Sequence, residues 1–168
     1  LHKNQMLTRK DWTVLGAGLG LFGLLSIGNM SRWSVRFDEA YGLYLIRYGF
    51  LDIAKYTSTD VHPPLYYWVL KIWQAIFGNS EIALRSLSMV MIMIAIVFVY
   101  LLARRAFGVR VGAWVVALLA LSPMMIRYAE EARMYGMVMA IVAAATYVLI
   151  DVTSKPSRRK WVLYGILV

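Results

Sequence analysis

The sequence predicts an all-α integral membrane protein, a multi-span helical bundle with two interfacial helices in its first external loop. Of its 168 residues, 61% are hydrophobic and only 16% are charged, whereas soluble domains carry about 25% charged residues. The mean hydropathy is +0.62. In addition, apolar stretches recur along the chain at close to the length of roughly 20 residues that crosses a bilayer as a helix.

Four apolar stretches are candidate membrane spans, and a fifth begins near the end of the chain. They cover residues 12–31, 86–103, 111–126, 134–150 and 161–168. The third is short, but Arg110 and Arg127 at its ends can extend their charged groups to the membrane surfaces. Because the fifth stretch stops while still apolar, we expect residues 1–168 to form the N-terminal transmembrane module of a longer protein.

The distribution of basic residues predicts the orientation. Ten of the 18 Lys and Arg residues lie before the first span, between the second and third spans, or between the fourth and fifth. The positive-inside rule places these groups in the cytoplasm. The prediction is therefore a multi-pass protein of the inner (plasma) membrane with a cytoplasmic N-terminus and external loops at 32–85 and 127–136. Orientation in the bilayer explains the net charge of +9 without a nucleic-acid partner.

The long external loop should contain two short helices. The first covers about residues 39–49, and a polar link over 52–60 follows it. The second, 63–77, begins with prolines and contains Lys71 and two tryptophans, a composition that suits a helix lying at the membrane interface. The alternative is that 63–77 crosses the membrane, which would reverse the orientation of everything that follows.

An adjacent acidic pair, Asp38 and Glu39, occurs in "RFDEAYGLY". Neighbouring side chains on a helix point about 100° apart, so the two cannot face one ligand in the same way. One could serve a substrate while the other caps the helix or pairs with Arg36 or Arg32. The structural alternative is a helix N-terminus, where the dipole favours acids by about 0.3–1 kcal/mol.

The stretch "DVHPPLYYW" contains a second candidate, His62. A residue before proline is held in an extended conformation, which would fix this imidazole near the membrane surface as a donor to a phosphate or a hydroxyl group. Alternatively, Asp60 or His62 only caps the helix that follows.

The stretch "RYAEEARMYG" supplies further candidates. An arginine at this position, Arg127 or Arg133, suits the phosphate oxygens of a lipid head group. Alternatively, Arg127 pairs with Glu131 and Glu130 with Arg133. Tyr135 also suits the aromatic belt of a membrane interface.

Several kinds of site have no motif in the sequence. There is no cysteine, no Gly-rich phosphate loop, no metal-ligand spacing and no nucleophile elbow. No cofactor is therefore assigned, although a divalent cation bridging a phosphate and the carboxylates is compatible with these residues.

The quoted stretches, together with "SEIALRSLS" and "LLALSPMMIRYAEEARMYGM", resemble the N-terminal part of GT-C superfamily membrane glycosyltransferases. The likeness covers about residues 12–150. It points to the bacterial branch related to protein O-mannosyltransferases and to the lipid A aminoarabinose transferase.

The resemblance implies an enzyme that transfers a sugar, with inversion, from a polyprenyl-phosphate donor to an acceptor hydroxyl at the outer membrane face. It implies that Asp38 is the general base with Glu39 beside it, and that His62, Glu131, Arg133 and Tyr135 line the donor-phosphate side. The isolated module should be inactive. The alternatives are a non-catalytic polyprenyl-phosphate transporter, flippase or binding subunit, and a structural subunit. Only an enzyme needs the ionised carboxylate of Asp38.

Overall fold

The computed structural model describes residues 7–30, 36–59, 62–154 and 156–168, and within these ranges its regular elements are all helices. The prediction of an all-α fold is confirmed. In chain order the helices are α1 (Arg9–Met30), α2 (Phe37–Leu45), α3 (Phe50–Thr57), α4 (Leu65–Phe77), α5 (Glu81–Phe107), α6 (Val109–Ala120), α7 (Pro123–Ala129), α8 (Tyr135–Ser154) and α9 (Arg158–Leu167).

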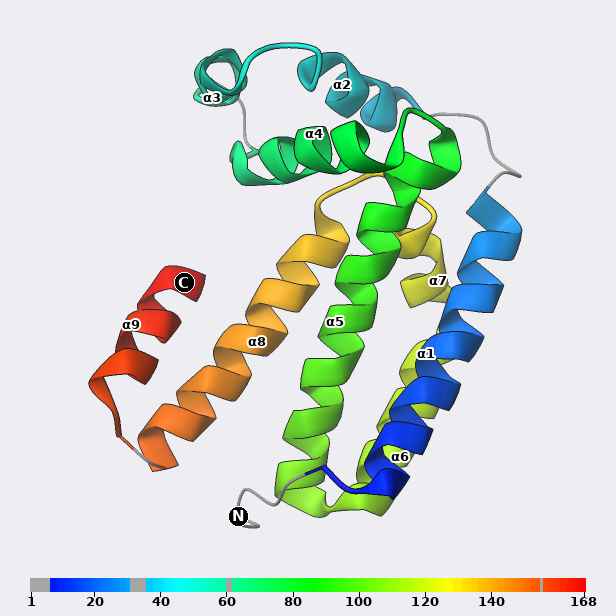
Figure 1. Cartoon of the computed structure of the whole chain (residues 1–168), viewed down its shortest axis with the longest axis vertical. Coiled ribbons are helices and arrows are strands. Elements are labelled where there is room, and N and C mark those ends of the chain that lie inside the picture. Colours follow the sequence, from blue (N-terminus) through cyan, green and yellow to red (C-terminus); the bar gives the residue numbers. More distant parts are fainter. Residues whose placement is uncertain (1–6, 31–35, 60–61, 155) are drawn as a thin grey trace.

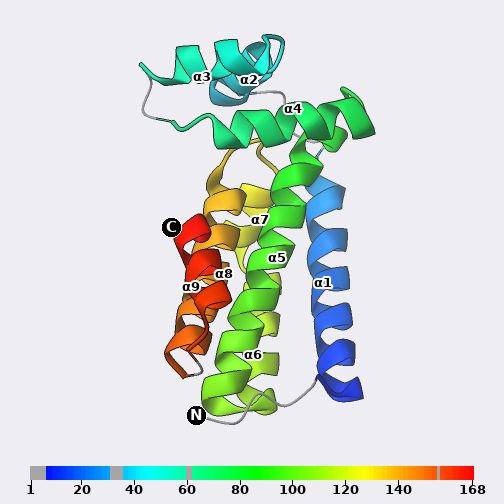
Figure 2. The same ribbon diagram turned by 60° about the vertical axis from the view of Figure 1, so that its left-hand side comes forward.

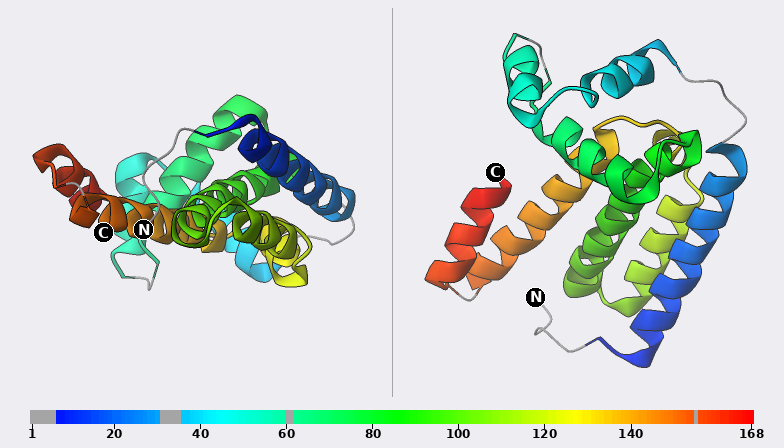
Figure 3. Two further views of the ribbon diagram at one scale, coloured as in Figure 1. Left: turned by 90° about the horizontal axis from the view of Figure 1, so that it is seen from below. Right: turned by 45° about the horizontal axis from the view of Figure 1, so that its top comes forward.

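Three of these helices, α1, α5 and α8, are long and apolar enough to cross a membrane. They run side by side, with α5 in the middle (Figure 1). The pair α6 and α7 makes a fourth candidate span, bent by 59°. Seen along the bundle, α5 lies between α8 on one side and α6 and α1 on the other (Figure 3, left).

The bend between α6 and α7 interrupts the stretch 111–126, for which the sequence suggests a single helix. Pro123 occupies the first turn of α7 and Ser122 precedes it in an extended conformation. Proline has no N–H to donate to the preceding turn and disfavours helical geometry in the residue before it. The helix therefore ends at Ala120, and α7 continues at an angle of 59° to α6 and packs mainly against α5 and α1.

The segment between α1 and α5 forms a separate layer of helices over one end of the bundle (Figures 1 and 2). It contains three helices, α2, α3 and α4, where the sequence analysis expects two. The additional helix α3 replaces most of the expected polar link, because Phe50, Ile53, Ala54 and Thr57 recur at helical spacing and two of them, Ile53 and Thr57, are buried.

Helix α4 supports the rest of this layer. Its Trp68 indole N–H donates to the carbonyl of Phe50 (2.9 Å), and Lys71 donates to the carbonyl of Ile46 (2.7 Å). These bonds fix the connection between α2 and α3 onto α4, which crosses the ends of the long helices (Figure 2). The interfacial position of α4 stays a prediction.

The opposite end of the bundle contains the basic groups. Arg104 pairs with the fully buried Asp11 (Nε to Oδ1, 2.8 Å), and Asp151 pairs with Arg105 (3.1 Å) and Lys160 (2.6 Å). These ion pairs join the start of α1 to the end of α5, the end of α5 to the end of α8, and the end of α8 to the start of α9, all at the same end of the bundle (Figure 1). Through these ion pairs, Asp11 and Asp151 connect the ends of neighbouring helices. The other basic side chains that the structure describes at this end are exposed.

The contact of α8 with α5 depends on a glycine. A Cβ atom at Gly136 would lie 2.7 Å from the backbone oxygen of Ser88 and 3.1 Å from Ile92. We therefore expect Gly136→Ala to push α8 away from α5 and to lower the free energy of unfolding by about 1–3 kcal/mol. Thermal unfolding in detergent measures this. Gly16→Ala is the matched control, because nothing lies within 4 Å of its Cβ position; equal melting temperatures for the two variants would contradict the prediction.

Candidate functional site

The acidic pair lies in the first turn of α2, with its two side chains in different environments. Glu39 is buried and Asp38 is exposed. Among the described residues, the Asp38 carboxylate has no hydrogen bond or ion pair. The two acids therefore differ in environment, as the sequence analysis allows. The Asp38 carboxylate is exposed to solvent, and the Glu39 carboxylate is buried.

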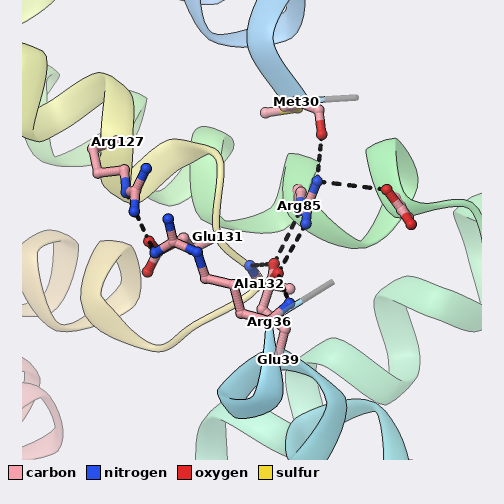
Figure 4. Close-up of polar contacts among 8 residues, drawn as sticks. Met30, Arg36, Glu39, Arg85, Arg127, Glu131 and Ala132 are labelled. Carbon is pink, nitrogen blue, oxygen red and sulfur yellow. Dashed lines mark hydrogen bonds and ion pairs between the residues drawn. The ribbon is translucent and has the colours of Figure 1, made fainter. Parts of the chain in front are cut away.

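Glu39 forms a buried ion pair with Arg85 of α5 (Figure 4). Its two oxygens accept from Arg85 Nε (3.0 Å) and Nη2 (2.8 Å), and both side chains are 3% exposed. It also accepts the backbone N–H of Ala132 (2.8 Å) and of Arg36 (3.1 Å). With four donors to two oxygens, the Glu39 carboxylate is saturated, and we assign it a positioning role in place of a catalytic one.

Arg85 connects four parts of the chain at this end of the bundle. Besides Glu39, it donates to the backbone carbonyl of Met30 at the end of α1 and lies 3.6 Å from Glu81 (Nη1 to Oε2). The ion pair thus joins α1, α2, α5 and the connection between α7 and α8 that contains Ala132. A buried cation at the end of a span requires such partners, since an unpaired charge there is costly.

Glu131, on the connection between α7 and α8, is shared by two arginines. Its Oε1 accepts from Arg127 Nε (2.9 Å) and from Arg36 Nη1. The Arg127–Glu131 pair is the one that the spacing suggests. Arg36 lies 95 residues earlier in the chain, so the structure brings the start of α2 into direct contact with the connection between α7 and α8.

Arg133 contacts both α2 and the ring of Tyr135. Arg133 Nη1 donates to the backbone carbonyl of Asp38 (3.1 Å), and its guanidinium lies 5.8 Å from the centre of the Tyr135 ring. The Tyr135 ring also contacts Tyr128, with 4.9 Å between ring centroids. The arginine thus fixes the backbone of the residue whose carboxylate is exposed.

His62 belongs to the connection between α3 and α4, three residues before α4 begins, and is half-buried. The N-cap of α4 is Pro64, and it has no side-chain hydrogen bond. Asp60 and Arg32, the other residues considered as a cap and as a partner, lie outside the described residues.

Glu130, next to Glu131, is also nearly buried. Burial raises the pKa of its carboxyl group above the ordinary value, while the positive charge of Arg127 acts in the opposite direction. A small cavity separates these groups. It is lined by three arginines and three glutamates, namely Arg36, Glu39, Arg85, Arg127, Glu130 and Glu131.

The charged groups of this site pair with one another and do not converge as metal ligands. Within the part of the chain that the structure describes, no three His, Asp or Glu side chains form a group that could hold a metal ion.

Comparison with known protein families finds a match over part of the chain. A model of the dolichyl-phosphate-mannose-protein mannosyltransferase family matches residues 61–168, more than half of the chain. The chain belongs to this family. No curated protein and no solved structure matches it. The family is one of glycosyltransferases, so the predictions of a glycosyltransferase and of a membrane-embedded transferase are confirmed at that level.

The matched segment includes most of the candidate site, with His62, Arg85, Arg127, Glu131 and Arg133 among its residues. Asp38 and Glu39 precede it, so their assignment depends on the geometry. Sequence reasoning assigned no role to Arg85, although a charge directly before the apolar stretch 86–103 is a signal that a buried acid must be nearby.

Proposed function

We propose that this protein transfers a sugar from a polyprenyl-phosphate donor to an acceptor hydroxyl at the outer membrane face, with inversion. We place it in the GT-C superfamily, in the bacterial branch related to protein O-mannosyltransferases and to the lipid A aminoarabinose transferase. One observation carries the proposal: the exposed carboxylate of Asp38 lies on an element that Arg85 and Arg133 anchor at one end of the bundle.

Asp38 is the group we assign as general base. Its carboxylate accepts the proton of the acceptor hydroxyl as the hydroxyl oxygen forms a bond to the anomeric carbon of the sugar. The bond between that carbon and the phosphate oxygen breaks, and its electron pair leaves with the polyprenyl phosphate. With one carboxylate and one displacement, the configuration at the anomeric carbon inverts, unlike the double displacement of retaining glycosidases.

The cationic groups around Asp38 are assigned to the leaving phosphate. Arg127 and Arg133 offer guanidinium donors, whose forked geometry suits phosphate oxygens, and Tyr135 and His62 offer further donors from the neighbouring connections. Stabilising the charge that develops on the phosphate lowers the barrier to bond breaking. Arg85 and Glu39 act indirectly, by fixing α2 on the ends of α1 and α5.

The proposed orientation follows from the charges at the two ends of the bundle. The basic clusters around Arg9, Arg104 and Arg158 lie at the end opposite α2, α3 and α4 (Figure 1). A cytoplasmic N-terminus in the inner membrane agrees with the positive-inside rule. The layer formed by residues 36–77 is then external, where the head group of a lipid-linked donor meets a secreted or surface acceptor.

The anomeric configuration of the product tests this proposal. The full-length protein in membranes receives a polyprenyl-phosphate sugar of known configuration, and NMR of the product determines the new linkage. We expect the opposite configuration from that of the donor. A retained configuration would contradict a single displacement. Movement of the donor across the bilayer without any product would favour the alternative function of a non-catalytic polyprenyl-phosphate transporter.

A further inference from the structure

Two arginines from different elements meet at one carboxylate oxygen. Arg36 is the N-cap of α2 and Arg127 lies in the last turn of α7, and both donate to Oε1 of Glu131. The arginine side chains are 40% and 42% exposed, whereas Glu131 is 14% exposed. The cationic groups are therefore accessible from outside, with the carboxylate lying beneath and between them (Figure 4).

The position of Arg36 is electrostatically unfavourable unless an anion lies next to it. The N-terminus of a helix carries the positive end of the helix dipole, which disfavours a cation and favours an anion. Arg127 adds a second positive charge at the same place. Glu131 Oε1 is the acceptor that the two guanidinium groups share, so a negative charge at this point offsets part of the positive charge of both.

The cavity that these charged groups enclose is too small for a phosphate in addition to the Glu131 carboxylate. The cavity lined by the three arginines and three glutamates has a volume of about 10 Å³, which is about the room needed for one water molecule. The six lining residues carry three positive and three negative charges, so an added phosphate would meet no net attraction. A phosphate can bind both arginines only if the Glu131 carboxylate moves away.

We propose that Arg36 and Arg127 form a phosphate-binding site that the Glu131 carboxylate occupies when no substrate is present. The ligand is the phosphate of an isoprenoid phosphate, an identification that rests on the function proposed above. Donor binding displaces Glu131 from the arginines. The same carboxylate competes with the polyprenyl phosphate after transfer and so promotes its release. Glu131 therefore opposes phosphate binding.

Binding of farnesyl phosphate to the purified protein in detergent, measured by titration calorimetry, tests the proposal. Glu131→Gln keeps the shape of the side chain and removes the competing charge. We expect it to bind farnesyl phosphate about tenfold more tightly than the wild type, the scale of one charge-assisted hydrogen bond. Arg36→Gln should bind it more weakly. Farnesol, which lacks the phosphate, should show neither change.

The opposite signs of the two effects separate the proposal from a loss of folding, which would weaken binding in both variants. Asp52→Asn and Arg47→Gln are matched controls, because each removes one exposed charge near α2. Asp52 lies on α3, and Arg47 lies just after α2. Unchanged or weaker binding by Glu131→Gln would overturn the proposal, and so would unchanged binding by Arg36→Gln. If inverting sugar transfer is nevertheless observed in the wild type, the proposed function stands and only the role of Glu131 fails.

Discussion

Replacing Arg85 with methionine is expected to lower the free energy of unfolding by about 3–5 kcal/mol, the cost of leaving one member of a buried ion pair without its partner. Arg85 and Glu39 are each only 3% exposed, so water cannot replace the lost contacts. The N–H groups of Ala132 and Arg36 would remain with Glu39 but supply no positive charge. Thermal unfolding of the purified protein measures the effect.

Two further variants make this test specific. Arg47→Met removes an exposed arginine that follows α2 and should leave the melting temperature close to that of the wild type. Adding Glu39→Gln to Arg85→Met removes the stranded charge and should recover a large part of the lost stability. The burial argument fails if Arg85→Met melts like the wild type, or if the double variant is no more stable than Arg85→Met.

Replacing Asp38 with asparagine is expected to lower the rate of sugar transfer by at least about 10²-fold, the contribution of a general base. Asparagine keeps the size of the side chain and cannot accept the proton of the acceptor hydroxyl. The fold should be unaffected, because the Asp38 side chain is exposed and Arg133 binds its backbone carbonyl. Initial rates at saturating donor, with matched amounts of protein, measure the loss.

The appropriate control for this variant is Asp52→Asn, which removes an exposed acid from the first turn of α3 in the same outer layer. Its transfer rate should equal that of the wild type. A similar loss in both variants would mean that transfer needs acidic charge in general in the layer formed by α2, α3 and α4. The assignment of Asp38 as the general base would then be wrong.

The sequence predicted the helical fold because the apolar stretches are close to the length that crosses a bilayer. The break before Pro123, at the start of α7, was not predicted, although a proline often marks a helix boundary. Helix α3 was not predicted, because the charged residues Asp52 and Lys55 interrupt its short apolar pattern. Its burial depends on α4, which the local sequence does not reveal.

Part of the candidate site was predictable from the sequence. The pairing of Arg127 with Glu131 follows from local spacing, whereas the spacing of Asp38 and Glu39 left open which of the two acids is exposed. The partner of Glu39 does not, because Arg85 is 46 residues away and Arg36 and Arg32 were nearer candidates in the sequence. Nor does the contact of Arg36 with Glu131, 95 residues apart, since it depends on how the two external segments pack.

The most direct test of the account measures donor binding and sugar transfer in one sample. Membranes containing the wild type or Asp38→Asn receive a radiolabelled polyprenyl-phosphate sugar, and bound donor and transferred label are counted together. We predict that Asp38→Asn retains the donor and forms no product, because the phosphate groups are bound by arginines and only the proton acceptor is missing. Undiminished transfer, or loss of donor binding together with transfer, would contradict the assignment of Asp38 as the general base.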